Sequence, residues 1–166
     1  LASKDPSGTL YVAFQDGIGR FQSNGFERLF SFPKQFTADG ATVSINGALC
    51  CVFYGQNSLA VNRNGTFVFR AFTDTFNRLI RYDRGTFTSL MTEGGPAQTN
   101  SPAGGKFSGI ANGFSHQNSG VIDDNGRVFV SGVVTGGPSG LFLFENGQWK
   151  TAGFFGGKRG AGGPVS

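Results

Sequence analysis

The chain has 166 residues, of which 38% are hydrophobic and 14% are charged, and it contains 28 glycines and 19 phenylalanines. This composition excludes an intrinsically disordered chain, which would need low hydrophobicity and high net charge. No run of apolar residues is long enough to cross a membrane as a helix. The net charge of +4 is modest for this length and does not by itself indicate an acidic partner.

Phe, Val, Thr and Gly are the residues of strands and tight turns, and we find no convincing apolar stripe with a helical period. The sequence therefore predicts an all-β fold, in a single domain of residues 1–166.

A short segment occurs three times, at residues 5–12, 62–69 and 123–130. Each copy begins with a turn-forming polar residue, has a glycine three residues later, and continues into an apolar run. The polar residues are Asp5, Asn62 and Asp123, and the glycines are Gly8, Gly65 and Gly126. The glycines are 57 and 61 residues apart. A period of this size predicts a repeat architecture, in which one unit cannot bury its apolar face alone.

In each copy the apolar run predicts a first strand, at residues 10–14, 67–72 and 128–134. A second predicted strand follows at residues 18–22, 78–82 and 141–144. A tight turn then leads to a third strand that begins with an aromatic residue, and a glycine supplies the positive φ that hairpin turns need. The turn glycines are Gly25, Gly85 and Gly147, and the aromatic residues are Phe26, Phe87 and Trp149.

The segments between these predicted hairpins, residues 33–57 and 93–118, can each supply a fourth strand. The first of them contains a continuous apolar run at residues 48–54, which predicts a buried strand. The approximate repeats are then residues 1–57, 58–118 and 119–166, each a four-stranded antiparallel sheet. Such units arranged radially form β-propellers, typically with four to eight blades.

The middle copy, residues 62–69, resembles the repeat of bacterial surface and secreted proteins with an Asn-x-x-Gly-x-x-Ala-Phe signature. Residues 140–144 and the Pro-Ala-Gly-Gly segment at 102–105 are similar to the strand and the loop that follow this signature. The first and third copies depart from it, because Asp5 and Asp123 replace the asparagine. The resemblance implies β-propeller-like repeats and an extracellular or cell-surface location in a bacterium. It implies no enzymatic activity.

Three blades are too few to close a propeller, and closure is what removes free sheet edges. We therefore expect an incomplete ring, which either homo-oligomerises or is a fragment of a longer propeller. A dimer of the chain would supply six blades.

Cys50 and Cys51 are adjacent in the predicted strand at residues 48–54. Neighbouring strand residues point to opposite faces, which opposes a vicinal disulfide unless the backbone distorts. Two small buried side chains are the interpretation we prefer. A strained, redox-sensitive vicinal disulfide, of the kind some propeller enzymes carry near a cofactor, is the alternative.

No group of residues predicts catalysis, a cofactor or a metal ion. His116 is the only histidine, and no partner is spaced to form a zinc site or a Ser-His-Asp arrangement with it. Asp123 and Asp124 have oxygens that suit calcium, but turn formation explains the same positions in the other copies. No pair of carboxylates stands out for glycoside hydrolysis.

Arginine is concentrated in the middle copy, where Arg78 and Arg81 flank the second strand. Their guanidinium groups could contact a phosphate or sulfate, and nearby aromatic rings could stack bases. Because the aromatic residues recur at equivalent repeat positions, core packing explains them better, and we do not expect nucleic acid as a partner.

The sequence thus predicts a non-enzymatic extracellular module that binds a ligand or acts as a scaffold. Its recognition loops would be residues 15–17, 73–77, 94–105 and 135–140, and its ligand a carbohydrate or a protein. Two alternatives stay open. The chain could be a self-assembling subunit of a ring, shell or filament, or it could be a lectin-like carbohydrate binder.

Overall fold

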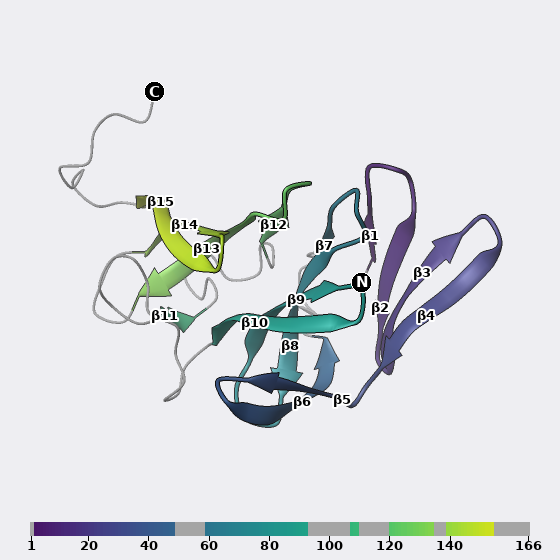
Figure 1. The fold of residues 1–166 in the computed structure, drawn as a ribbon, viewed down its shortest axis with the longest axis horizontal. Coiled ribbons are helices and arrows are strands. Elements are labelled where there is room, and N and C mark those ends of the chain that lie inside the picture. Colours follow the sequence, from purple (N-terminus) through teal and green to yellow (C-terminus); the bar gives the residue numbers. More distant parts are fainter. Residues whose placement is uncertain (1, 49–58, 93–106, 110–119, 135–138, 155–166) are drawn as a thin grey trace.

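The computed structural model describes residues 2–48, 59–92, 107–109, 120–134 and 139–154. These residues form antiparallel β-sheets that lie side by side in chain order (Figure 1). The all-β prediction is therefore confirmed. Among the described residues no helix is long and apolar enough to cross a membrane.

The first sheet contains four strands in the order of the sequence. They are β1 (Ala2–Lys4), β2 (Leu10–Phe14), β3 (Gly17–Gln22) and β4 (Gly25–Ser31). The turn that joins β1 to β2 carries the first copy of the repeated segment. Strands β2, β3 and β4 are the three strands that the sequence predicts for the first repeat.

The second and third sheets contain the same four-stranded unit. In the second sheet the unit is β7 (Leu59–Val61), β8 (Phe67–Thr73), β9 (Arg78–Asp83) and β10 (Thr86–Thr92). In the third it is β12 (Val121–Ile122), β13 (Val128–Val134), β14 (Ser139–Glu145) and β15 (Gln148–Phe154). In both units each strand pairs with the strand that follows it in the unit.

Additional strands extend the second and third sheets. Strands β5 (Lys34–Ala38) and β6 (Ala41–Ala48) form a hairpin, and β6 pairs with the C-terminal part of β8, whose N-terminal part pairs with β7. Strand β11 (Phe107–Gly109) pairs in the same way with the C-terminal part of β13. Residues 34–48 therefore belong to the second sheet, although the sequence division at residue 57 assigns them to the first repeat. Of the run predicted as a strand at residues 48–54, only Ala48 lies within the described residues, as the last residue of β6.

The aromatic residues after the hairpin turns occupy equivalent places in the three sheets. Each one faces an aromatic residue on the neighbouring strand, and the two ring centroids are 5.1 Å apart in every sheet. The pairs are Phe21 with Phe26, Tyr82 with Phe87, and Phe144 with Trp149. Cross-strand aromatic pairs of this kind stabilise a sheet. Their repetition confirms that the aromatic positions form part of the repeated fold.

An irregularity in the pairing also recurs at one place. The last strand of each unit has an extra residue opposite its neighbour, a β-bulge that bends the strand and increases its twist. The extra residues are Leu29 in β4, Leu90 in β10 and Ala152 in β15. A shared bulge shows that the three units have the same backbone shape as well as the same strand order.

One predicted equivalence is wrong in detail. Gly85 and Gly147 are the second residues of two-residue hairpin turns, with φ of 89° and 77°. In the first sheet Gln22 pairs with Gly25, so the turn residues are Ser23 and Asn24, and Gly25 begins β4. Gly25 still has a positive φ of 119°. It is therefore displaced by one residue from the position of the other two glycines.

The sheets pack face to face, and each sheet has two distinct faces. We call the face that carries Leu10, Phe67 or Val128 the leading face, and the face that carries Tyr11, Val68 or Phe129 the trailing face. The trailing face of the first sheet packs on the leading face of the second in one apolar cluster. The trailing face of the second sheet packs on the leading face of the third in another. Both junctions therefore follow the same stacking rule, in which the trailing face of one sheet packs on the leading face of the next.

The first junction is rich in aromatic side chains. Phe67 is fully buried there, and its ring centroid lies 4.7 Å from that of Tyr82, 5.8 Å from Tyr11 and 5.9 Å from Phe69. The Phe30 ring from β4 lies 5.2 Å from Tyr82. Trp149 contributes to the second junction, where its indole N–H donates a 3.0 Å hydrogen bond to the Leu90 carbonyl.

We expect alanine to be worse tolerated at Gly65 than at Gly126. Both glycines have φ near the left-handed region, 75° and 78°, so a side chain costs about 1–2 kcal/mol at either position. A Cβ on Gly65 would also come within 2.8 Å of the Tyr11 hydroxyl, whereas a Cβ on Gly126 would meet nothing within 4 Å. Denaturant unfolding of Gly65→Ala and Gly126→Ala measures the difference. It should shrink when Tyr11 is replaced by Phe, and equal losses in the two alanine variants would contradict the contact.

Candidate binding site

The repeated turn is built by one side chain that satisfies the backbone of its own loop. Asn62 Oδ1 accepts hydrogen bonds from the N–H groups of Asn64 and Thr66, each at 3.0 Å. Asp123 Oδ1 accepts in the same way from Asn125 at 3.0 Å and Arg127 at 2.8 Å. This is the turn chemistry that Asp and Asn favour.

The first copy follows the same plan. Asp5 Oδ1 accepts from the Thr9 N–H at 2.9 Å and from the Ser7 hydroxyl at 2.7 Å. In all three turns the glycine N–H donates to the carbonyl of the first residue, at 3.0, 3.1 and 3.0 Å. Gly8, Gly65 and Gly126 therefore have equivalent surroundings in their own loops, as the sequence predicts.

The second and third turns are bonded to each other. Asn62 Nδ2 donates to the Asp123 carbonyl, and Asn64 Nδ2 donates to the Asp124 carbonyl, both at 2.9 Å. The Arg63 N–H donates to Asp124 Oδ1, also at 2.9 Å. Aspartate at position 62 could form the turn but could not donate to Asp123. The difference between Asn62 and Asp123 therefore has a structural reason, although the turn alone would accept either residue.

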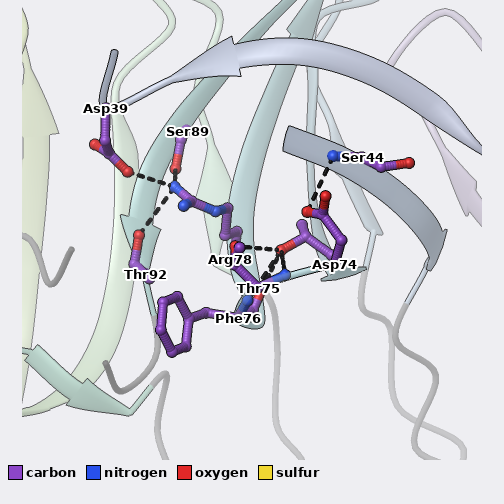
Figure 2. Close-up of polar contacts among 9 residues, drawn as sticks. Asp39, Ser44, Asp74, Thr75, Phe76, Arg78, Ser89 and Thr92 are labelled. Carbon is purple, nitrogen blue, oxygen red and sulfur yellow. Dashed lines mark hydrogen bonds and ion pairs between the residues drawn. The ribbon is translucent and has the colours of Figure 1, made fainter. Parts of the chain in front are cut away.

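Arg78 is buried, and its guanidinium group has protein partners (Figure 2). Its Nη1 lies 2.7 Å from Asp39 Oδ2, 3.0 Å from Ser89 Oγ and 3.2 Å from Thr92 Oγ1. Asp39 lies in the turn between β5 and β6, so the ion pair fastens that hairpin to β9 and β10. The contacts seen at Arg78 are thus those of a structural residue within the second sheet.

A second tie holds the same hairpin. The Ser44 N–H on β6 donates to Asp74 Oδ1 at 3.1 Å, and the Asp74 N–H donates to the Ser44 carbonyl at 3.1 Å (Figure 2). Asp74 belongs to the loop between β8 and β9, within the predicted recognition loop at residues 73–77. This loop therefore contributes to the attachment of β5 and β6.

Arg81 has different surroundings from Arg78. The two residues are three positions apart on β9, so they lie on opposite faces of the sheet, and the structure does not bring them together as one anion site. Arg81 instead lines a cavity of about 420 Å³. The other lining residues come from two turns of the third sheet and are Asn125, Gly126, Arg127, Glu145, Asn146 and Gly147.

Two charged residues that line this cavity, Arg127 and Glu145, form ion pairs with Asp123 and Lys150. Arg127 Nε lies 2.6 Å from Asp123 Oδ2, and Glu145 Oε2 lies 2.7 Å from Lys150 Nζ. Burial opposes ionisation of Asp123, but hydrogen bonds from Arg127 outweigh it and lower the pKa of that carboxyl. The hydrogen bond from Lys150 and its charge lower the pKa of Glu145. Both carboxylates therefore stay ionised at neutral pH.

We expect these ion pairs to make the fold acid-sensitive. The lowered pKa values of Asp123 and Glu145 give stability that is present above the unfolded-state values, about 4, and lost as the pH falls through the folded-state values. Asp123→Asn keeps an oxygen for the turn, as Asn62 does, but removes the charge. Its Tm should therefore fall less than that of the native chain between about pH 6 and pH 3. Equal losses of Tm in scanning calorimetry would show that Asp123 contributes nothing to the acid response.

A second cavity lies at the corresponding edge of the first sheet. It has a volume of about 540 Å³ and is lined by Ser7, Gly8, Thr9, Leu10, Phe21, Gln22 and Ser23. It lies between the repeated turn and the hairpin turn of the first sheet, as the first cavity lies between the same two turns of the third sheet. The sequence offers no signal for either cavity, because only strand pairing brings together the two turns, about 15 to 20 residues apart, that line each one. The first cavity also requires the packing of two sheets, since Arg81 lines it from the second sheet.

Several predicted site residues fall outside the part of the chain that the structure describes. These are Cys50 and Cys51, together with the loops at 94–105 and 135–138. His116, for which the sequence predicts no site, also lies outside the described residues. Within the described ranges, no group of three or more His, Cys, Asp or Glu side chains could hold a metal ion. Comparison of the chain with family models, curated proteins and solved structures finds no match.

Proposed function

We propose that the chain is a non-enzymatic binding scaffold made of β-propeller-type repeats. Three equivalent antiparallel units support the propeller-type repeats, because each unit packs its trailing face on the leading face of the next. The short strands β1, β7 and β12 come first in the three units, and β7 contacts both of the others. In a propeller the corresponding strands lie next to one another around the axis. The resemblance of residues 62–69 to bacterial surface repeats supports an extracellular location.

The observation that carries a binding role is the cavity at Arg81. Its lining consists of guanidinium, carboxylate and amide side chains together with two turns that contain glycine. These groups donate and accept hydrogen bonds in several directions. Pockets for apolar ligands are lined mostly by hydrophobic and aromatic side chains. We therefore assign this cavity to a hydrophilic ligand, and a carbohydrate fits the mixture of donors and acceptors.

The repeat provides a natural comparison for Arg81. Arg20 on β3 occupies the equivalent position, and its strand partner is Glu27, with Nη2 and Oε2 2.7 Å apart. A hydrogen bond with Glu27 and another with Tyr11 raise the pKa of Arg20. The strand partner of Arg81 is Thr88, which has no charge to neutralise it. The guanidinium group of Arg81 is therefore better suited to bind a ligand than that of Arg20.

A carbohydrate array followed by calorimetric titration of the best glycan tests this function. Arg81→Ala should weaken binding about tenfold or more, because a hydrogen bond to a charged group contributes about 1.5–3 kcal/mol. Arg20→Ala is the matched control and should leave the affinity unchanged. If no glycan binds, or if both variants bind as the native chain does, the carbohydrate site at Arg81 is wrong.

A further inference from the structure

The leading face of the first sheet carries a group of exposed apolar side chains. Leu10 is 37% exposed, Phe14 39%, Phe21 45% and Phe26 43%. The ring of Phe26 lies 5.1 Å from Phe21 and 5.4 Å from Phe14, so the three rings are in contact. Contiguous apolar surface of this kind marks an interaction site.

The residues equivalent to Leu10 and Phe14 in the other two sheets are buried, and those equivalent to Phe21 and Phe26 are buried or half-buried. Leu10 corresponds to Phe67 and Val128, and both of these are 0% exposed. Phe21 corresponds to Tyr82, which is 8% exposed. In each case the cover is the trailing face of the preceding sheet. The repeat thus shows what kind of surface covers a leading face.

The backbone of the first sheet also differs in a way that adds aromatic surface. Gly19 occupies the position of Ile80 and Phe142, which are both core residues. A Cβ at Gly19 would lie 2.3 Å from the Phe26 ring. The ring of Phe26 therefore fills the space that a core side chain fills in the other sheets, and it remains exposed.

The trailing face of the third sheet is the opposite end of the stack. It carries Val121, Phe129, Leu141 and Leu143, which lie on one face because of their strand pairing. Val121 is 58% exposed and the other three are half-buried. In the first two sheets the residues equivalent to Phe129 and Leu141 are at most 2% exposed. This face is thus apolar, and among the described residues it lacks the cover that the other trailing faces have.

We propose that the leading face of the first sheet binds the trailing face of the third sheet in a second copy of the chain. The contact would continue the stacking rule of both internal junctions across two molecules. It joins two different surfaces and is therefore heterologous, the type of contact that closes into a ring when the rotation permits. Two copies joined twice would give a ring of six units, within the usual range of four to eight. This inference goes beyond the carbohydrate site and does not depend on it.

Sedimentation analysis of the 166-residue chain at about 100 μM tests the contact, since interfaces of ordinary size bind with micromolar affinity or better. We expect a dimer, twice the chain mass of 17.5 kDa. Phe21→Glu blocks the leading face and Leu143→Glu blocks the trailing face, so each variant alone should be a monomer. Phe72→Glu is the control, because Phe72 is an exposed apolar residue of the middle sheet and should leave the dimer intact. Circular dichroism checks that each variant is folded.

Mixing the two blocked variants makes the test specific. A Phe21→Glu copy keeps its trailing face and a Leu143→Glu copy keeps its leading face, so the mixture should regain a two-chain species through one intact contact. A symmetric dimer through the leading face alone would be broken by Phe21→Glu and unaffected by Leu143→Glu. That result, or a native chain that stays monomeric, would overturn the proposal. Failure of the mixture to associate would also overturn it.

Discussion

Replacing Phe67 by alanine should destabilise the fold by about 3–5 kcal/mol, the usual cost of removing a buried phenylalanine ring. Phe67 is fully buried at the junction between the first and second sheets, in contact with the rings of Tyr11, Phe69 and Tyr82. Its loss would leave a cavity that three large rings cannot easily fill by moving. Urea unfolding followed by tryptophan fluorescence measures the change.

Leu10→Ala is the matched control for this prediction. Leu10 occupies the same position in the first repeat but is 37% exposed. At protein concentrations low enough to keep the chain monomeric, the substitution should cost less than about 1 kcal/mol. Similar losses for Phe67→Ala and Leu10→Ala would show that the two leading faces are covered to the same extent, contrary to the structure.

Replacing Asp39 by asparagine should destabilise the fold by about 3 kcal/mol, because it leaves the buried guanidinium group of Arg78 without its counter-ion. The side chain of Arg78 is 3% exposed and that of Asp39 is 47% exposed, so water can approach only one partner. Asparagine tolerates the positive φ of 54° at this position, which separates the charge effect from backbone strain. Chemical denaturation of the variant gives the free energy of unfolding.

The double variant Asp39→Asn with Arg78→Met provides the control. Once the buried charge is removed as well, the loss should be smaller than in Asp39→Asn alone, since replacing both members of a buried ion pair is often nearly neutral. Additive losses would mean that the two side chains do not act as a pair. A change below about 1 kcal/mol in Asp39→Asn would mean that solvent already compensates Arg78.

The sequence predicts much of the repeated unit because its signals are local. Strands β2, β8 and β13 follow the glycine of each turn, and the aromatic residues that begin the last strands fall at equivalent places. Turn chemistry and alternation of apolar residues depend on neighbours within one hairpin, and both can be read along the chain. The all-β class and the three-fold repetition therefore follow from sequence alone.

The long-range pairings could not be predicted in the same way. Strand β6 pairs with β8, and no local feature of residues 41–48 specifies that partner. The role of Arg78 depends on Asp39, which lies 39 positions earlier, in a hairpin the sequence did not assign to the second sheet. The cavity at Arg81 depends on turns from the third sheet. These features arise from tertiary packing. A repeat pattern predicts the strands of one unit, but it does not predict which other segments pair with that unit or pack against it.

The middle sheet is the only one of the three whose leading and trailing faces both enter an apolar cluster of the described residues. In stacked repeat proteins stability is approximately a sum of unit and neighbour terms, so an end unit loses one interface on opening and the central unit loses two. Fraying should therefore start at the outer sheets of an isolated molecule. Amide protons of β8 and β9 should therefore exchange with solvent most slowly. The difference in exchange rate between the central and the outer sheets should become smaller when another molecule binds to an end face.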